Sequence, residues 1–266
     1  MPDGGSERES PLGGARDEEG RLTQGSTARP VGSGLAVLRR LLGRVPFLRS
    51  GWGLALTLKH FLLDSSGRAR ADFDREFTRS EDPWGYDTPE GQKRLRRAMA
   101  MLDAARGAER FPQALEIGCA AGAFTELLAS RCDSLLAVDI SPVALQRSHE
   151  RRSWPESVRF AEWDLRRDPL PGIFDLIVVM SVLEYYGRPR DLRAAREKLV
   201  EGVNPGGYLL VGDVRQSELY ETTWWGKRLI RGGKWISEFV AEHPALKLVE
   251  RVAEDYYVLA LFRKVA

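Results

Sequence analysis

A loop of small residues follows the end of an apolar segment in Leu115-Glu116-Ile117-Gly118-Cys119-Ala120-Ala121-Gly122. The apolar segment predicts a strand, and a helix is predicted to begin directly after the loop. Small residues let a backbone come close to a ligand, and a helix start offers unpaired N–H groups and a positive dipole. The stretch therefore predicts a ligand-binding loop between a strand and a helix.

The strand predicted after that helix ends in Asp139. A carboxylate at this position is placed to accept hydrogen bonds from both hydroxyls of a ribose. Dinucleotide dehydrogenases and methyltransferases both use such a loop and carboxylate. Gly118, Ala120 and Ala123 occupy the three positions of a degenerate G-x-G-x-x-G pattern, which by itself does not separate the two classes.

Helical and strand-like patterns alternate on both sides of this loop. Helices are predicted at 88–106, 123–131, 142–151 and 190–202, with further helical segments at 217–242. Strands are predicted at 114–117, 134–139, 158–162, 174–180 and 208–213, and an antiparallel hairpin at 246–253 and 256–263. This order predicts an α/β fold: a doubly wound, mostly parallel seven-stranded sheet with an antiparallel C-terminal hairpin.

Four features favour a methyltransferase over a dehydrogenase. Glu116 lies inside the end of the first strand, where dehydrogenases usually have an apolar residue or glycine. Asp164-Leu165 follows the third strand, where an acid can accept a hydrogen bond from an adenine amino group. Asn204-Pro205-Gly206-Gly207 turns directly into the fifth strand, and the chain closes with a hairpin instead of a second nucleotide-binding half.

With these features, the segment Phe73 to Arg263 resembles the class I S-adenosylmethionine-dependent methyltransferases. The resemblance implies a Rossmann-like fold and S-adenosylmethionine as the cofactor. The loop residues that it implies around the methionine part of the cofactor are Glu116, Gly118, Cys119, Ala120 and Gly122. Ala120 departs from the family pattern, in which a glycine is common there.

The same resemblance implies roles for residues that follow the next strands. Asp139 would hold the ribose, and Ile140 would pack on the adenine. Asp164 and Leu165 would frame the adenine, and Ser181 would lie near the reacting methyl group.

A narrower resemblance rests on Phe73-Asp74-Arg75-Glu76-Phe77, Asp82-Pro83-Trp84-Gly85-Tyr86 and Ser181-Val182-Leu183-Glu184-Tyr185-Tyr186. These segments look like the nodulation protein S family, N-methyltransferases that act on an amino sugar of a lipo-chitooligosaccharide. Pro83 and Gly85 predict a turn that presents two aromatic rings. The rings either cover the cofactor, with Trp84 as a binding residue, or pack into the core.

The candidate catalytic residues are Glu184, Tyr185 and Tyr186. They follow the fourth strand, outside the carboxyl ends of the parallel strands, where ligands bind in such sheets. An amine must be neutral to accept a methyl group, so a nearby carboxylate or phenol can take its proton. Glu184 fits equally well as a surface residue or a helix cap.

Three tryptophans, Trp224, Trp225 and Trp235, lie between the fifth and sixth strands. They either border the acceptor site or pack against the sheet. The first functional hypothesis is N-methylation of a small molecule, an amino sugar or sugar-bearing metabolite. The second is O-methylation of a hydroxylated metabolite, and the third is a cofactor-binding protein without turnover, tethered to a partner or membrane.

The chain divides into a tail at 1–34, a basic segment at 35–72 and the methyltransferase domain at 73–266. The tail has almost no large apolar side chains and is predicted to be disordered. The segment 35–63 predicts basic amphipathic helix, and its apolar run at 52–63 is too short to cross a bilayer. It predicts either peripheral contact with an anionic membrane or packing on the domain or a second subunit.

Composition and charge also predict which kinds of partner, disulfide and metal site the protein lacks. The 266 residues carry a net charge of +2, a balance that predicts no nucleic-acid partner. The only two cysteines, Cys119 and Cys132, exclude a disulfide scaffold and suit a reducing cytosol. No cysteine or histidine cluster predicts a metal site, and the polar N-terminus does not resemble a signal peptide. A cytoplasmic location is expected.

Overall fold

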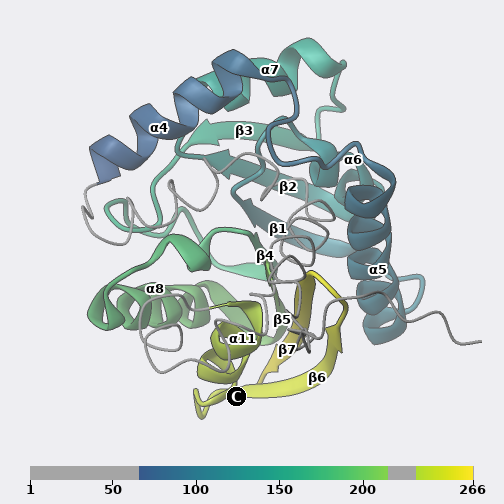
Figure 1. Cartoon of the computed structure of the whole chain (residues 1–266). Coiled ribbons are helices and arrows are strands. Elements are labelled where there is room, and N and C mark those ends of the chain that lie inside the picture. The colour runs from purple at the N-terminus through teal and green to yellow at the C-terminus, as the bar shows by residue number, and fades with distance from the viewer. Residues whose placement is uncertain (1–65, 215–231, 266) are drawn as a thin grey trace, which may run out of the picture. The chain divides into compact units, whose positions relative to one another are not determined.

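The structure is a computed structural model that describes residues 66–214 and 232–265. Its centre is a seven-stranded sheet with the order β3-β2-β1-β4-β5-β7-β6, which can be followed from top to bottom in Figure 1. The strands are β1 (Phe111–Ile117), β2 (Cys132–Asp139), β3 (Val158–Glu162), β4 (Phe174–Met180), β5 (Val203–Val214), β6 (Leu246–Ala253) and β7 (Tyr257–Lys264). Strands β1 to β5 pair in parallel, and β7 pairs antiparallel with both β5 and β6. The predicted fold class is confirmed.

Helices cover both faces of the sheet (Figure 1). On one face α5 (Pro89–Arg106) and α6 (Ala123–Ala129) pack through residues such as Leu102 and Leu128. On the other face lie α8 (Pro189–Gly202) and α11 (Gly233–Ala241), which bury residues such as Leu199 and Ile236. Because side chains alternate along a strand, each apolar strand contributes to both cores.

Three strands begin earlier than the sequence predicted. Strand β1 starts at Phe111 instead of 114, β2 at Cys132 instead of 134, and β5 at Val203 instead of 208. The pairing of β5 with β4 jumps from Phe174–Val203 to Leu176–Tyr208, so the predicted turn at 204–207 forms an irregularity inside the strand. Turn-forming residues that bulge out of a strand pairing have the same sequence pattern as residues that end a strand, so the strand is predicted to start after them.

Helix α4 (Ser66–Arg79) precedes the sheet and lies beside α7 (Pro142–Arg151) (Figure 1). The predicted division at residue 72/73 falls within this continuous helix. The Ser141 hydroxyl at the start of α7 donates to Asp74 at 2.5 Å, and Arg70 pairs with Glu162 at the end of β3. Helix α4 is thus attached to the sheet at the carboxyl ends of its strands.

Several predicted features lie outside the described residues. They are the tail at 1–34, the basic helix at 35–63, and the helical segment at 217–231 with Trp224 and Trp225. Among the described residues, no helix has both the length and the apolar composition that a membrane crossing requires.

Candidate functional site

A cavity opens at the carboxyl ends of the parallel strands. The chain runs from β1 outward to β3 and then returns to β4, which lies on the other side of β1. Such a reversal leaves a crevice between two strands where open α/β sheets bind ligands. The cavity and its open mouth together hold about 980 Å³ of empty space, which includes solvent at the mouth.

The loop after β1 forms one wall of this cavity. Gly118 has a φ of +77°, and a Cβ at this position would lie 2.5 Å from the Val182 side chain after β4. Ala120 also adopts a left-handed backbone, with a φ of 51°. Ala120, which stands where the family commonly has glycine, therefore occupies a backbone conformation that favours glycine.

Asp139 closes the same wall at the end of β2. It is 8% exposed, and its two carboxylate oxygens accept hydrogen bonds from the backbone N–H groups of Ala120 and Ser141, both at 2.9 Å. Burial raises the pKa of Asp139 to about 6, although these backbone donors lower it. A carboxylate offers about four acceptor positions, so this one retains capacity for a ligand's hydroxyls.

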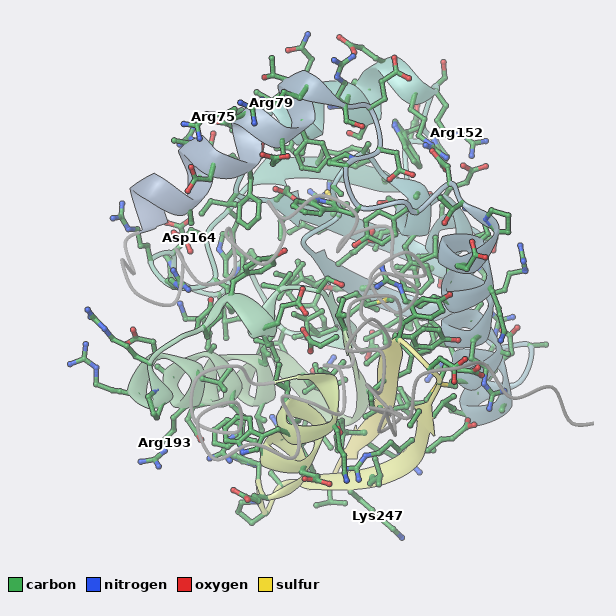
Figure 2. The ribbon with its side chains drawn as sticks, in the orientation of Figure 1. Arg75, Arg79, Arg152, Asp164, Arg193 and Lys247 are labelled. Carbon is green, nitrogen blue, oxygen red and sulfur yellow. The ribbon has the colours of Figure 1, made fainter. Side chains whose placement is uncertain are left out.

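The segment after β3 lines the next part of the cavity. Ile140, Trp163 and Leu165 supply apolar surface, and Asp164 supplies a carboxylate. One oxygen of Asp164 accepts from the Arg166 N–H at 2.8 Å, which fixes the turn. Figure 2 shows Asp164 near the start of α4, while the arginines at 75 and 79 lie on the helix's outer side.

Aromatic rings form the opposite wall. Trp84 lies edge-on to Phe73 and Phe77 of α4, at centroid distances of 6.1 and 6.4 Å. Phe73 in turn meets Tyr185 edge-on at 5.2 Å. Trp84, Phe73, Phe77 and Tyr185 all line the cavity, and Trp84 is partly exposed. Trp84 and Tyr86 therefore face the cavity and also contact the apolar residues around Ala120.

The turn that carries Trp84 is built from local hydrogen bonds. Asp82 accepts from the N–H groups of Tyr86 and Asp87, both at 2.8 Å. Asp87 then pairs with Arg151 of α7, and hydrogen bonding from Arg151 lowers the pKa of Asp87. The turn and α4 are therefore both attached to α7.

The third wall is polar and contains the candidate catalytic residues. Glu184, Tyr185 and Tyr186 all line the cavity. Glu184 and Tyr185 belong to the 3-10 helix η1 (Leu183–Tyr185). Burial raises the pKa of Glu184 to about 7, against a hydrogen bond from the Val214 N–H and the nearby Arg94 guanidinium. Burial, and after it Glu184, raises the pKa of Tyr185 well above its ordinary value.

Ser181 and Arg94 complete this wall. Ser181 has a left-handed backbone, with a φ of 54°, and its hydroxyl accepts from Arg94 at 3.3 Å. The Arg94 guanidinium also lies 4.9 Å from the centre of the Tyr86 ring. Strained backbone at a cavity wall is typical of functional sites.

Most of the predicted site residues line the main cavity: Trp84, Gly118, Ala120, Asp139, Ile140, Asp164, Leu165, Ser181, Glu184, Tyr185 and Tyr186. Glu116 and Cys119 line a smaller cavity behind the loop, which Tyr86 and Gly118 share. The Glu116 carboxyl is 3% exposed and accepts from the Thr125 hydroxyl at 2.6 Å. Gly122 packs against the Trp154 ring, 2.8 Å from where a Cβ would lie.

Trp235 and the two described histidines lie elsewhere. Trp235 is 38% exposed, stacks on Phe239 at 5.2 Å and does not line the cavity. His243 bonds to Glu197 at 3.0 Å, and His149 packs edge-on against Phe160.

Arg94, Trp163 and Arg166 line the cavity, and Asp213 accepts a hydrogen bond from the Glu184 backbone, but none of the four was predicted from the sequence. Arg94 is 8% exposed, yet it is one of several arginines in α5. Its one available signal is spacing, since Arg94 shares a helix face with the buried Ala98 and Met101. The sequence signal for Asp213 was its position near the end of an apolar strand, which resembles the position of Asp139 in β2.

Comparison with known proteins agrees with this geometry. Residues 68–242, more than half of the chain, match the family model "Nodulation protein S (NodS)". The nodulation protein S of Rhizobium tropici is 36% identical over 138 residues, which cover 52% of this chain and 57% of that protein. The chain thus spans about three fifths of that curated relative. A mitochondrial ubiquinone biosynthesis O-methyltransferase of Schizosaccharomyces pombe is 30% identical over 109 residues, 40% of this chain and 39% of that protein.

A solved structure is similar over most of the described fold. It is the N-methyltransferase NodS from Bradyrhizobium japonicum WM9 in complex with S-adenosyl-L-homocysteine, with 31% identity and a TM-score of 0.63. The match covers 73% of this chain and 97% of that one. The Rossmann-like methyltransferase fold is therefore confirmed, and the chain belongs to the nodulation protein S family.

Proposed function

We propose that this protein is an S-adenosylmethionine-dependent methyltransferase that methylates a primary amine of a small, sugar-bearing acceptor. The observation that carries the proposal is the cavity at the strand ends. There the loop after β1, the Asp139 carboxylate and the half-buried Glu184 carboxyl with its raised pKa meet. The NodS structure that the chain resembles is that of an N-methyltransferase in complex with S-adenosyl-L-homocysteine.

The cavity residues fit this cofactor part by part. Gly118 lines the cavity without a side chain, which leaves room for the methionine chain, and the Arg94 guanidinium suits its carboxylate. Asp139 accepts from the ribose hydroxyls, the apolar side chains of Ile140, Trp163 and Leu165 pack on the adenine, and Asp164 accepts from its amino group. When bound, the cofactor supplies an electrophilic methyl group on a sulfonium.

The protein's own residues position the acceptor and exclude water. The aromatic wall of Phe73, Trp84 and Tyr185 closes the site, and a dry, oriented site accounts for much of the rate of a displacement. Glu184 takes one proton from the acceptor's ammonium group, which frees the nitrogen lone pair. That lone pair forms the N–CH₃ bond while the S–CH₃ bond electrons return to sulfur. Afterwards Glu184 releases its proton to water.

The pKa of Glu184 favours an amine over a hydroxyl acceptor. A carboxyl with a pKa of about 7 is matched to ammonium groups, whose pKa in α-amino compounds is about 8, and poorly matched to phenols at about 10. The pKa of Tyr185 is raised, so this phenol stays neutral and does not serve as the base. Among the three predicted catalytic residues, we assign the base role to Glu184.

A second candidate is O-methylation, which the similarity to a ubiquinone biosynthesis O-methyltransferase favours. The test is incubation of the full chain with methyl-labelled S-adenosylmethionine and matched acceptors, followed by product mass spectrometry. The panel pairs free amino sugars with their N-acetylated counterparts and adds phenols and lipids. Label on the free amine alone supports the proposal, and label on hydroxyls alone contradicts it. Cofactor binding without label on any acceptor would favour a non-catalytic cofactor-binding protein.

A further inference from the structure

Two carboxyl groups, the buried Asp213 and the half-buried Glu184, meet where η1 follows β4 and where β5 ends. The backbone N–H of Glu184 donates to the Asp213 carboxylate at 3.3 Å. The backbone N–H of Val214, the residue after Asp213, donates to the Glu184 carboxylate at 3.2 Å. Each carboxyl is thus held by the backbone of the other element, so η1 and β5 fix one another.

Asp213 is far more buried than an isolated carboxylate tolerates. It is 2% exposed, and its second oxygen, Oδ2, has no hydrogen-bond partner among the described residues. The start of α11 covers it closely, since a Cβ on Gly233 would lie 2.5 Å from the Asp213 carbonyl oxygen. Burial, and after it the Glu184 carboxyl, raises the pKa of Asp213 well above its ordinary value.

Burial of Asp213 beside the Glu184 carboxyl therefore favours the protonated, neutral form of Asp213. Two negative charges at one buried site would repel each other, which protonation of one group avoids. Among the described residues, the charged and titratable groups that face the pair are Arg94 from α5, Tyr86 from the turn and Tyr185 of η1. Arg94 supplies the one positive charge among them.

Only Glu184 of the pair lines the cavity, so Asp213 can act on an acceptor only through Glu184. We propose that Asp213 is a positioning residue, a neutral carboxylic acid whose oxygen holds the Glu184 backbone so that the Glu184 carboxyl faces the acceptor. The inference rests on the proposed function, in which Glu184 takes the amine proton. It adds a second carboxyl, from β5, to the site.

The test compares Asp213→Ala with Asp213→Asn in the full chain. Asparagine keeps an acceptor oxygen and no charge, whereas alanine leaves the Glu184 N–H without its partner. Asp213→Ala should lower kcat by about tenfold or more, because an unheld group loses its alignment. Its dissociation constant for S-adenosylhomocysteine should change by less than about twofold, and Asp213→Asn should keep kcat within about threefold of wild type.

Asp175→Ala is the matched control. Asp175 also accepts a backbone N–H of a neighbouring strand, that of Gln113 at 3.0 Å, but beside the start of β1, away from the cavity. This change should lower the melting temperature without lowering kcat. If Asp213→Ala does not fold, Asp213→Ser replaces it, because the serine hydroxyl is too short to reach the same N–H.

Glu184→Gln and the double variant with Asp213→Ala separate the two proposals. If Asp213 acts through Glu184, the double variant should be no slower than Glu184→Gln alone. Multiplying effects, or an unchanged kcat in Asp213→Ala, would overturn the positioning role. An unchanged kcat in Glu184→Gln would instead contradict the base role in the proposed function.

The pH profile of kcat tests the charge of Asp213. Wild type should lose activity as the pH falls below about 7, the pKa of Glu184, and Asp213→Asn should show the same acid limb. If Asp213 were ionised, its removal would shift that limb down by about one unit or more. Such a shift would overturn the assignment of a neutral Asp213.

Discussion

At the scale of single residues, Asp139 is expected to contribute most to cofactor affinity. Asp139→Ala should weaken S-adenosylhomocysteine binding at least about tenfold, because it removes charged hydrogen bonds worth about 1.5–3 kcal/mol each. Asp164→Asn should cost less, since the amide keeps one acceptor oxygen. Calorimetry on both folded variants measures the two losses, and the opposite ranking would mean that the two carboxylates are wrongly assigned.

The pKa of Glu116 predicts how the stability of the fold depends on pH. Burial, opposed by the hydrogen bond from Thr125, raises its pKa from 4.5 to about 8. The folded protein therefore holds this proton more tightly than the unfolded chain does. Its contribution to stability is fully present below about pH 4.5 and is lost as the pH rises through about 8.

Glu116→Gln removes this titration. The variant's stability relative to wild type should rise by roughly 1.4 kcal/mol per pH unit between about pH 5 and 8 and then level off. Urea unfolding of the ligand-free protein at several pH values measures the difference. A difference that does not change with pH would mean that Glu116 is ionised in the folded protein.

At the scale of elements, α4 and the turn that follows it form one wall of the site. Trp84→Ala should lower the affinity for S-adenosylhomocysteine several-fold and change the melting temperature of the ligand-free protein little, because Trp84 is partly exposed and faces the cavity. Tyr86→Ala should lower both, because the Tyr86 ring also packs on the sheet core. Unchanged binding and turnover in both variants would contradict the role of this wall as a cover.

Deletions test the same wall on a larger scale. Removal of residues 1–34 should leave cofactor binding intact. Removal of 1–86 also deletes α4 with its Asp74–Ser141 contact and the Trp84 turn, so it should impair binding. Titration of both truncated chains with S-adenosylhomocysteine checks this. Full binding by the shorter chain would show that the site is complete without α4.

At the scale of the whole molecule, the strand order brings the ends of β1, β2 and β4 to one edge, so a bound cofactor contacts several elements at once. S-adenosylhomocysteine at about 100 times its dissociation constant should stabilise the fold by about 2.7 kcal/mol. For a domain of this size, each kcal/mol raises the melting temperature by about 2–4 °C. NAD at equal concentration is the control, and stabilisation by NAD alone would contradict the choice of cofactor.

Local patterns were sufficient to predict the sheet and one side of the site. An apolar strand, a small-residue loop and a helix start are neighbours in the chain, so Gly118, Ala120 and Asp139 could be found from the sequence. Strands β3 and β4 and helix α7 have the predicted bounds. Strand β4 is a continuous apolar run buried on both faces, and α7 is a capped helix, so each has a clear local pattern. The start of β5 was missed, since its bulge contains turn residues.

The polar wall of the site was decided by the tertiary structure. Arg94 and Asp213 are far apart in the chain. Their local signals, a helix-face spacing and a position near a strand end, are too common in α/β folds to single them out. They become functional candidates because packing excludes water from both and brings each close to Glu184. Burial and long-range proximity are properties of the folded chain: they change a carboxyl's pKa and charge, whereas the sequence by itself determines only which groups are there to be buried.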